Sequence, residues 1–254
     1  MRIAVVSDIH GNLTAFEAVL ADLRLTSPDL VLHGGDLVHG GSMPEEIVDR
    51  VRELGWEGVV GNTDEMLWIP ESLDEFARNV PKLALLMATI QQMIPPTLEK
   101  LGDERVAWLR NQPRMQRTES VALVHASPES CWRAPMPNAT DEEMESTYAG
   151  LGRPIAVYGH IHRSHVRSLQ GMTVVNTGSV SLSYDGDPRA SYLLLDGSKA
   201  TIRRVSYDIE AEARAIMHCG LPHAAWICQT LRAATYVLRE QPEKGASRVS
   251  RAYN

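Results

Sequence analysis

The chain is poor in cysteine, in basic residues relative to acidic ones, and in long apolar runs. Its three cysteines, Cys131, Cys219 and Cys228, form no C-x-x-C pair, so we expect no disulfide framework and a reduced, cytoplasmic location. The formal net charge of −7 gives no sign of the basic face that long nucleic acid requires, so we expect no partner of that kind. Because no apolar run approaches the ~20 residues of a membrane span, we expect no membrane partner.

The N-terminal quarter alternates between short apolar runs typical of buried strands and apolar residues at helical spacing. The expected strands cover 3–7, 30–32 and 58–60, and the expected helices cover 13–23 and 45–54. This order predicts a largely parallel sheet with helices on its faces. We expect one α/β domain over 1–254, since such units often reach this length.

The pattern turns helical over about 65–110, and we expect this segment to be an insertion that covers one side of the sheet. Prolines at 70, 81, 95 and 96 predict a division into three or four short helices. The clearest of these are Leu83–Met93 and Thr97–Leu109.

Strand signals return in the C-terminal half. Apolar runs predict strands over 121–124, 155–158 and 172–175, and a hairpin over 191–195 and 200–206. Two helices are expected over about 208–239, broken near Gly220-Leu221-Pro222, and a loose polar tail follows them.

Five of the predicted strands end in a carboxylate, a carboxamide or an imidazole. Open α/β sheets bind their ligands just beyond the carboxyl ends of the strands, and residues i and i+2 of an extended segment point the same way. The side chains placed there are Asp8, His10, Asp36, Asn62, His125, His160 and His162. We therefore expect them to converge on one site.

The residue types at these positions are those of a transition-metal site. Imidazoles mixed with carboxylates suit Mn²⁺, Fe, Zn²⁺, Ni²⁺ or Co²⁺ better than Ca²⁺. Seven such groups exceed the three or four protein ligands of one catalytic zinc. The sequence therefore predicts two divalent metal ions that share a bridging carboxylate.

The order of these blocks resembles the calcineurin-like metallophosphoesterase superfamily. The family pattern D-x-H, G-D, G-N-x-[DH], H and G-H-x-H stands here as Asp8-Ile9-His10, Gly35-Asp36, Gly61-Asn62-Thr63-Asp64, His125 and Gly159-His160-Ile161-His162. The stretch from Asp185 to Tyr192, after Asn176–Val180, looks like the small prokaryotic, phosphodiesterase-like branch. The resemblance implies a four-layer αββα sandwich, here with the helical insertion and the C-terminal helices added.

The resemblance also implies roles for the seven residues. Asp8, His10 and His162 would bind the first metal, Asn62, His125 and His160 the second, and Asp36 both. Asp36, Asn62 and His125 would be catalytic, with Asn62 also touching the substrate. A hydroxide held by the two metals, most simply Mn²⁺, would attack the phosphorus of a small, nucleotide-like phosphodiester or phosphomonoester.

Thr63 departs from the family pattern, because many members carry a histidine there. A hydroxyl is no acid near neutral pH, so we expect leaving-group protonation to be weak or to come from elsewhere. Asp64 would orient His125 or another ligand. Asn12, at the start of a predicted helix, is a candidate substrate contact.

Two other functions fit the same fold. One is a non-catalytic scaffold, which the presence of all seven ligands argues against. The other is a serine/threonine protein phosphatase, from which the missing histidine at Thr63 and the short chain depart. His33 and His39 flank Asp36, and we expect both to be polar fillers rather than site residues.

Overall fold

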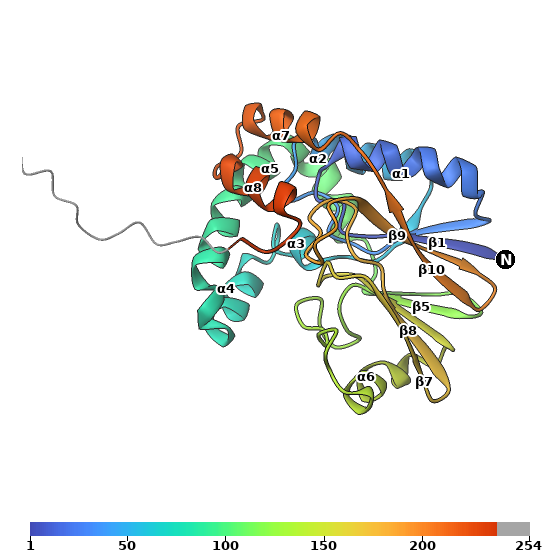
Figure 1. Ribbon diagram of the computed structural model, residues 1–254. Helices are drawn as coiled ribbons and strands as arrows, with labels where there is room; N and C mark the ends of the chain where they lie inside the picture. Colours follow the sequence, from blue (N-terminus) through green and yellow to red (C-terminus); the bar gives the residue numbers. More distant parts are fainter. Residues whose placement is uncertain (238–254) are drawn as a thin grey trace, which may run out of the picture.

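A computed structural model of the chain describes residues 1–237, and it consists of two five-stranded sheets packed face to face with helices outside them (Figure 1). The first sheet has the order β10-β9-β1-β2-β3, and the second has the order β4-β5-β6-β8-β7. The strands of the first sheet are β1 (Arg2–Val6), β2 (Leu30–His33), β3 (Glu57–Gly58), β9 (Ala190–Asp196) and β10 (Lys199–Val205). Those of the second are β4 (Met115–Arg117), β5 (Val121–Val124), β6 (Ile155–Tyr158), β7 (His165–Leu169) and β8 (Met172–Asn176).

Each sheet has a parallel centre with antiparallel strands beside it. β1, β2 and β3 run parallel, while β9 pairs antiparallel with both β1 and β10. β5, β6 and β8 run parallel, while β4 and β7 are antiparallel edges. The sheets are therefore mixed, and the carboxyl ends of the parallel strands carry the predicted ligands.

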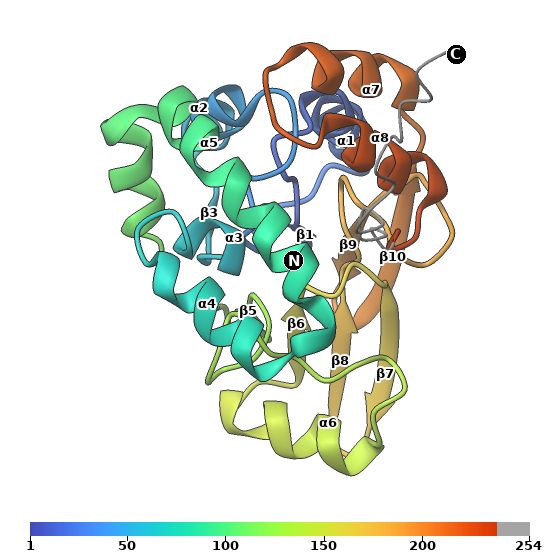
Figure 2. The same ribbon diagram turned by 90° about the vertical axis from the view of Figure 1, so that its left-hand side faces the viewer.

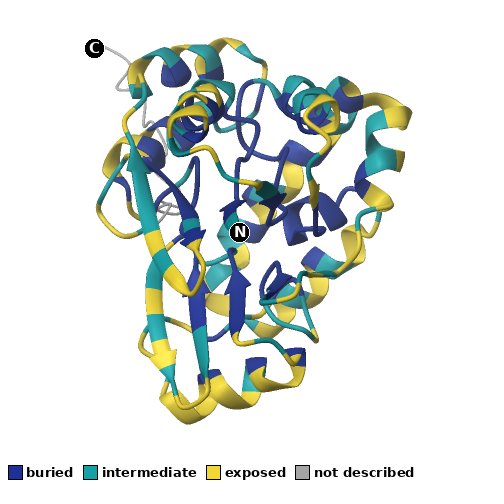
Figure 3. Ribbon diagram, turned by 90° about the vertical axis from the view of Figure 1, so that its right-hand side faces the viewer, coloured by how far each residue is buried: buried dark blue, intermediate teal, exposed yellow. Residues whose placement is uncertain are grey.

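Alternation along the strands separates the layers of the sandwich. Ile3 and Val5 of β1 pack with Val157 of β6 between the two sheets, whereas Ala4 and Val6 belong to the core beneath the helices on the outer side. Side chains two residues apart on a strand share a face, so one strand serves both cores. Figure 3 shows this as buried strands in the centre and exposed residues on the outward turns of the helices.

The helices form the outer layers of the predicted αββα sandwich, which the structure confirms. α1 (Leu13–Thr26) and α2 (Pro44–Glu53) cover the first sheet, and α6 (Asp141–Tyr148) packs on the second. Apart from the long α5 (Ala84–Arg110), the remaining helices are α3 (Asn62–Glu65), α4 (Pro70–Asn79), α7 (Ile209–His218) and α8 (Ala224–Ala233), with short 3-10 turns η1 (Pro81–Leu83) and η2 (Ala149–Leu151). Within the described residues, no helix is long and apolar enough to cross a membrane.

The insertion covers the carboxyl ends of the strands rather than a face of the sheet (Figures 1 and 2). Its main helix, α5 (Ala84–Arg110), runs through Pro95 and Pro96 and is interrupted at Gly102, so the predicted division at the two prolines is wrong. The carbonyls that the prolines leave unpaired belong to the exposed residues 91 and 92, where water can serve them. Gly102 has φ 65°, a conformation that only glycine adopts easily.

The predicted C-terminal helices correspond to α7 and α8, with the break between them as expected. Their predicted end near 239 and the predicted polar tail lie outside the described residues.

Candidate metal centre

Six of the seven predicted ligands lie in the loops that follow β1, β2, β5 and β6, and the seventh, Asn62, is the first residue of α3, after β3. The structure brings them together. Donor atoms of Asp8, His10, Asp36 and His162 all lie within 4.8 Å of one another, although His162 is about 150 residues away in sequence. The Nε2 atom of His162 is 3.1 Å from Oδ1 of Asp8 and 3.1 Å from Nε2 of His10. These side chains are buried, so an ion among them would be screened little by solvent.

A second group of donors meets at Asn62. The side-chain oxygen Oδ1 of Asn62 is 2.9 Å from Nε2 of His125 and 2.8 Å from Nδ1 of His160. One amide oxygen thus faces two imidazoles that come from the other sheet.

Asp36 lies between the two groups. Its Oδ2 atom is 3.7 Å from Nε2 of His10, and its Oδ1 atom is 3.5 Å from Nε2 of His125. The backbone N–H of Thr63 donates to Oδ1 over 2.8 Å and holds the carboxylate in place. Burial acts to raise the pKa of Asp36, but the nearby histidines, His125 foremost, hold that pKa well below its usual range.

Three backbone carbonyls fix the imidazole rings. The Nδ1 atoms of His10, His125 and His162 lie 2.7, 2.7 and 2.5 Å from the carbonyl oxygens of His39, Gly34 and Leu182. Since a carbonyl only accepts, each Nδ1 donates, and in the neutral ring the lone pair sits on Nε2, which faces the site.

Converging lone pairs of this kind favour a positive charge between them. Although burial alone lowers the pKa of His125, the carboxylate of Asp36 raises it to about 10. A divalent cation satisfies the same electrostatic demand with more charge. The donor set therefore fits transition-metal ions.

The backbone is turned into the left-handed region to aim these ligands. Five of the seven have a positive φ: Asp8 (58°), His10 (50°), Asp36 (52°), His160 (66°) and His162 (54°). This conformation is uncommon for residues with a Cβ and is concentrated at functional sites.

Two glycines leave the space that the carboxylates of Asp36 and Asp8 occupy. A Cβ on Gly61 would lie 2.1 Å from Oδ1 of Asp36, and a Cβ on Gly159 would lie 2.2 Å from Oδ2 of Asp8. Only hydrogen fits at these contacts. Gly61 therefore lets two loops of the first sheet approach each other, and Gly159 lets a loop of the second sheet close on Asp8 of the first.

Asp64 and Asn12 are both buried beside the ligand loops. The carboxylate of Asp64 accepts the N–H groups of Leu37 (2.9 Å) and Gly61 (3.2 Å) and so ties the Asp36 loop to the Asn62 loop. These contacts fit the expected role of orienting a ligand, with Asp36 and Asn62 in the place of His125. Asn12 is the N-cap of α1: Oδ1 accepts from Ala15, and the amide donates to Ser181. Fully buried, Asn12 has its side chain engaged in fold contacts rather than facing a substrate.

A cavity of about 410 Å³ opens above five of the ligands. One of its lining residues is His39, for which the sequence predicted no role in the site. His39 lines this cavity together with Thr63, is 3% exposed, and has both ring nitrogens without a hydrogen-bond partner among the described residues. Burial lowers its pKa to about 3. Its position three residues after Asp36 was a signal, but a short spacing of this kind does not distinguish a site residue from a filler.

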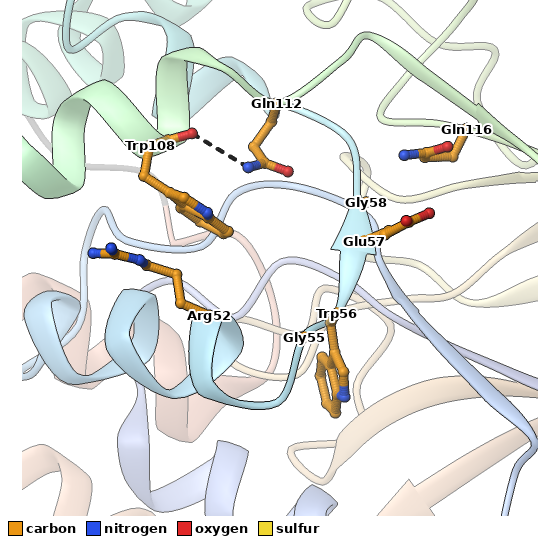
Figure 4. A pocket seen from close by; sticks show the side chains of 8 residues that line it. All are labelled: Arg52, Gly55, Trp56, Glu57, Gly58, Trp108, Gln112 and Gln116. Carbon is orange, nitrogen blue, oxygen red and sulfur yellow. Dashed lines mark hydrogen bonds between the residues drawn. The ribbon is translucent and has the colours of Figure 1, made fainter.

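A second cavity, of about 440 Å³, lies around β3 and the end of α5 (Figure 4). Trp56, directly before β3, and Trp108 of α5 both line it. The Gln112 amide donates to the Trp108 carbonyl over 3.2 Å. None of the seven predicted ligands lines this cavity. This second cavity is therefore separate from the predicted metal ligands.

Comparison with known proteins supports the fold and the motifs. Residues 1–200 match the calcineurin-like phosphoesterase superfamily domain. An uncharacterised protein of Methanocaldococcus jannaschii is 30% identical over 252 residues, covering 90% of this chain and 96% of that protein. A protein of Cronobacter sakazakii named symmetrical bis(5'-nucleosyl)-tetraphosphatase is 30% identical over 181 residues, or 68% of this chain. The match spans only 60% of that relative's length.

Solved structures give the same result. A metallophosphoesterase from Sphaerobacter thermophilus is 26% identical, with a TM-score of 0.73 over 92% of this chain and 100% of that one. A hypothetical protein from Pyrococcus horikoshii OT3 shares the fold, with a TM-score of 0.78 at 18% identity over 91% of this chain and 97% of that one. With its paired mixed sheets, its buried Asp/His cluster and the match over residues 1–200, the chain belongs to the calcineurin-like phosphoesterase superfamily.

Proposed function

We propose that the chain is a phosphoesterase that works with two divalent transition-metal ions, Mn²⁺ being our first choice. One ion would be held by Asp8, His10 and His162, the other by Asn62, His125 and His160, and both by Asp36. The observation that carries this proposal is the orientation of Asp36, whose two oxygens face histidines of different sets, His10 and His125. A single carboxylate between two donor groups is the arrangement that a shared ligand requires.

The chemistry divides between the ions and the chain. When bound, two such ions provide a nucleophilic water at neutral pH and neutralise charge on the phosphoryl oxygens. The chain's own residues supply orientation, because carbonyls lock three imidazoles and the Thr63 amide locks Asp36. This prior fixing means that little reorganisation is needed during the reaction.

The proposed substrate is a small phosphodiester or phosphomonoester. A cavity of about 410 Å³ above the ligands suits a small molecule, for which pockets of roughly 300–1,000 Å³ are usual. The relative named as a tetraphosphatase supports the nucleotide-like substrate expected from the sequence.

A non-catalytic scaffold on this fold has no need of a preserved site. Here the seven donors are present, buried or half-buried, and aimed by strained backbone. Strain of this kind persists only where the surrounding structure enforces it. The geometry therefore favours hydrolysis over docking.

The proposal is tested by metal removal and by replacing Asp36. Exhaustive chelation should abolish hydrolysis of bis(p-nitrophenyl) phosphate, and Mn²⁺ should restore it. Asp36→Asn should lower kcat about 100-fold or more, because it weakens both metal positions at once. The exposed Asp103 gives the matched control Asp103→Asn, which should leave rate and metal content unchanged. Full activity of metal-free protein would contradict the proposal.

A further inference from the structure

The cavity above the metal ligands has an apolar wall supplied by the insertion. Leu83, Leu86, Met87, Ile90 and Met93 all line it. Their spacing of three, four, seven and ten residues from Leu83 places them on one side of η1 and α5. Figure 2 shows α4 and α5 crossing in front of the strand ends.

Aromatic side chains complete the lining of the cavity. Trp132, Tyr184 and Trp226 line it, from segments separated by up to about 90 residues. Tyr184 stacks on the ligand His162, with ring centroids 4.7 Å apart and 18° between the planes. An apolar surface thus begins directly beside the place proposed for the phosphoryl group.

The side chain of Trp132 is fixed by contacts with Glu65 and Phe76. Its indole Nε1 donates to the Glu65 carboxylate over 3.2 Å, and Cys131 donates to the same oxygen over 3.0 Å. Arg114 pairs with the other Glu65 oxygen. Trp132 also packs against Phe76 at 5.3 Å, so its polar edge is satisfied away from the cavity and its ring forms a fixed part of the wall.

Positive charge is scarce around this cavity. Among the lysines and arginines of the described residues, Arg163 alone lines it; it is exposed at the rim, where its Nε donates to the Tyr184 carbonyl over 3.0 Å. The positive charge of two metal ions would balance the negative charge of one phosphoryl group bound beside the metal ligands. Further phosphates would be buried against leucine and methionine without partners, which is costly for charged groups.

We propose that this cavity binds an apolar alkyl or aryl group, so that the substrate is an ester with one phosphoryl group and a hydrophobic substituent rather than a dinucleoside polyphosphate. The inference rests on the proposed phosphoesterase function and specifies its substrate class. It separates this chain from its relatives named as tetraphosphatases.

The test uses the Mn²⁺-loaded full chain and a series of alkyl p-nitrophenyl phosphates from methyl to hexyl. The leaving group is constant, so differences in kcat/KM report on the alkyl group alone. We expect kcat/KM to rise about fourfold for each methylene buried, and diadenosine tetraphosphate to be a poorer substrate than the hexyl ester. Calorimetric affinities of alkylphosphonates, which are not hydrolysed, should rise with the same increment.

Variants identify the wall. Leu86→Asn and Ile90→Asn, made separately and checked for folding, should each reduce the increment to less than about twofold per methylene. Ala88→Asn, at an exposed position of the same helix, should leave the increase in kcat/KM per methylene unchanged. A flat chain-length dependence with intact cleavage of the methyl ester, or a preference for diadenosine tetraphosphate, would overturn the inference and leave the phosphoesterase function standing. If no ester is cleaved, the proposed function fails. The alkylphosphonate affinities alone then show whether the cavity binds an apolar group.

Discussion

Many family members carry a histidine at the position of Thr63, and this chain does not. The imidazole of His39 lines the same cavity as Thr63. Both ring nitrogens lack partners among the described residues, and burial keeps the ring neutral by lowering its pKa to about 3. A neutral N–H still donates a hydrogen bond, and such a donor stabilises charge that develops on a leaving oxygen. We therefore expect His39 to matter most for esters with poor leaving groups.

Replacing His39 by alanine tests this expectation. His39→Ala should lower kcat about 100-fold for alkyl phosphate esters but less than about threefold for p-nitrophenyl esters, whose leaving group needs little help. The substitution leaves the His39 carbonyl, which fixes His10, in place. The exposed His218→Ala is the matched control. Equal losses for both ester classes, or a loss of metal, would show that His39 acts through the fold instead.

His33, a second histidine beside the site loops, makes stability depend on pH. It is fully buried, and burial lowers its pKa from 6.5 to about 4. Below pH 6.5 the unfolded chain takes up a proton that the folded chain refuses. The stability linked to this group is therefore full above pH 6.5 and falls as pH drops towards 4.

The expected size is a loss of roughly 2 kcal/mol in the free energy of unfolding between pH 7 and pH 5 from this residue alone. Urea unfolding of the wild type and of His33→Asn at both pH values isolates it, since the variant should lose correspondingly less stability. The exposed His218→Asn should behave as the wild type does. An identical pH response of His33→Asn and the wild type would refute the assignment.

Among the structural elements, the ligand-bearing loops depend on glycines for their approach to one another. Gly61 has φ −96° and ψ 170°, which alanine adopts freely, so its requirement is space. A Cβ there would lie 2.1 Å from Oδ1 and 2.2 Å from the backbone N of Asp36. The β3–α3 loop and the Asp36 loop would have to separate.

Gly61→Ala should therefore lower metal content and reduce kcat about 100-fold or more, because Asp36 is displaced from both metal positions. Gly150→Ala in η2 is the control, since nothing lies within 4 Å of the Cβ that it would add. Metal analysis and the hydrolysis rate are the readouts. A Gly61→Ala protein with full metal content would mean that the loops tolerate separation.

The main elements and the ligands could be predicted from sequence because their signals are local. β1 and β6 are continuous apolar runs, and each ends in its ligands. β4 and β7 were not predicted. β4 has three residues, and β7 is a half-exposed edge whose alternation includes His165 and Arg167. Edge strands bury one face at most, so their apolar signal is weak.

The cavity could not be predicted, because its lining depends on tertiary placement. Leu86 and Ile90 on α5 have the pattern of any core-facing helix. That they face a site follows only from the position of α5 over the strand ends, beside Trp226 of α8. The continuation of α5 through Pro95 was missed for the same reason, since packing of the helix outweighed the local cost of the proline.

On the scale of the whole molecule, the proposed ions would join the two sheets. The first sheet supplies Asp8, His10, Asp36 and Asn62, and the second supplies His125, His160 and His162. Direct hydrogen bonds already cross this junction: the His160 N–H lies 3.1 and 3.2 Å from the two oxygens of Asp8. Metal binding would therefore stabilise the packing of the sheets as well as prepare the site.

Because the ligand set exists only in the folded chain, metal should raise the melting temperature. At a free Mn²⁺ concentration 100 times its Kd, one site contributes about 2.7 kcal/mol, or about 5–10 °C in a chain of this length. Calorimetric melting in chelator and in increasing Mn²⁺ should show Tm rising with the logarithm of metal concentration for the wild type and for Asp103→Asn. Asp36→Asn should lose most of the rise. A Tm that does not change with Mn²⁺ would mean that the two sheets are not bridged by metal.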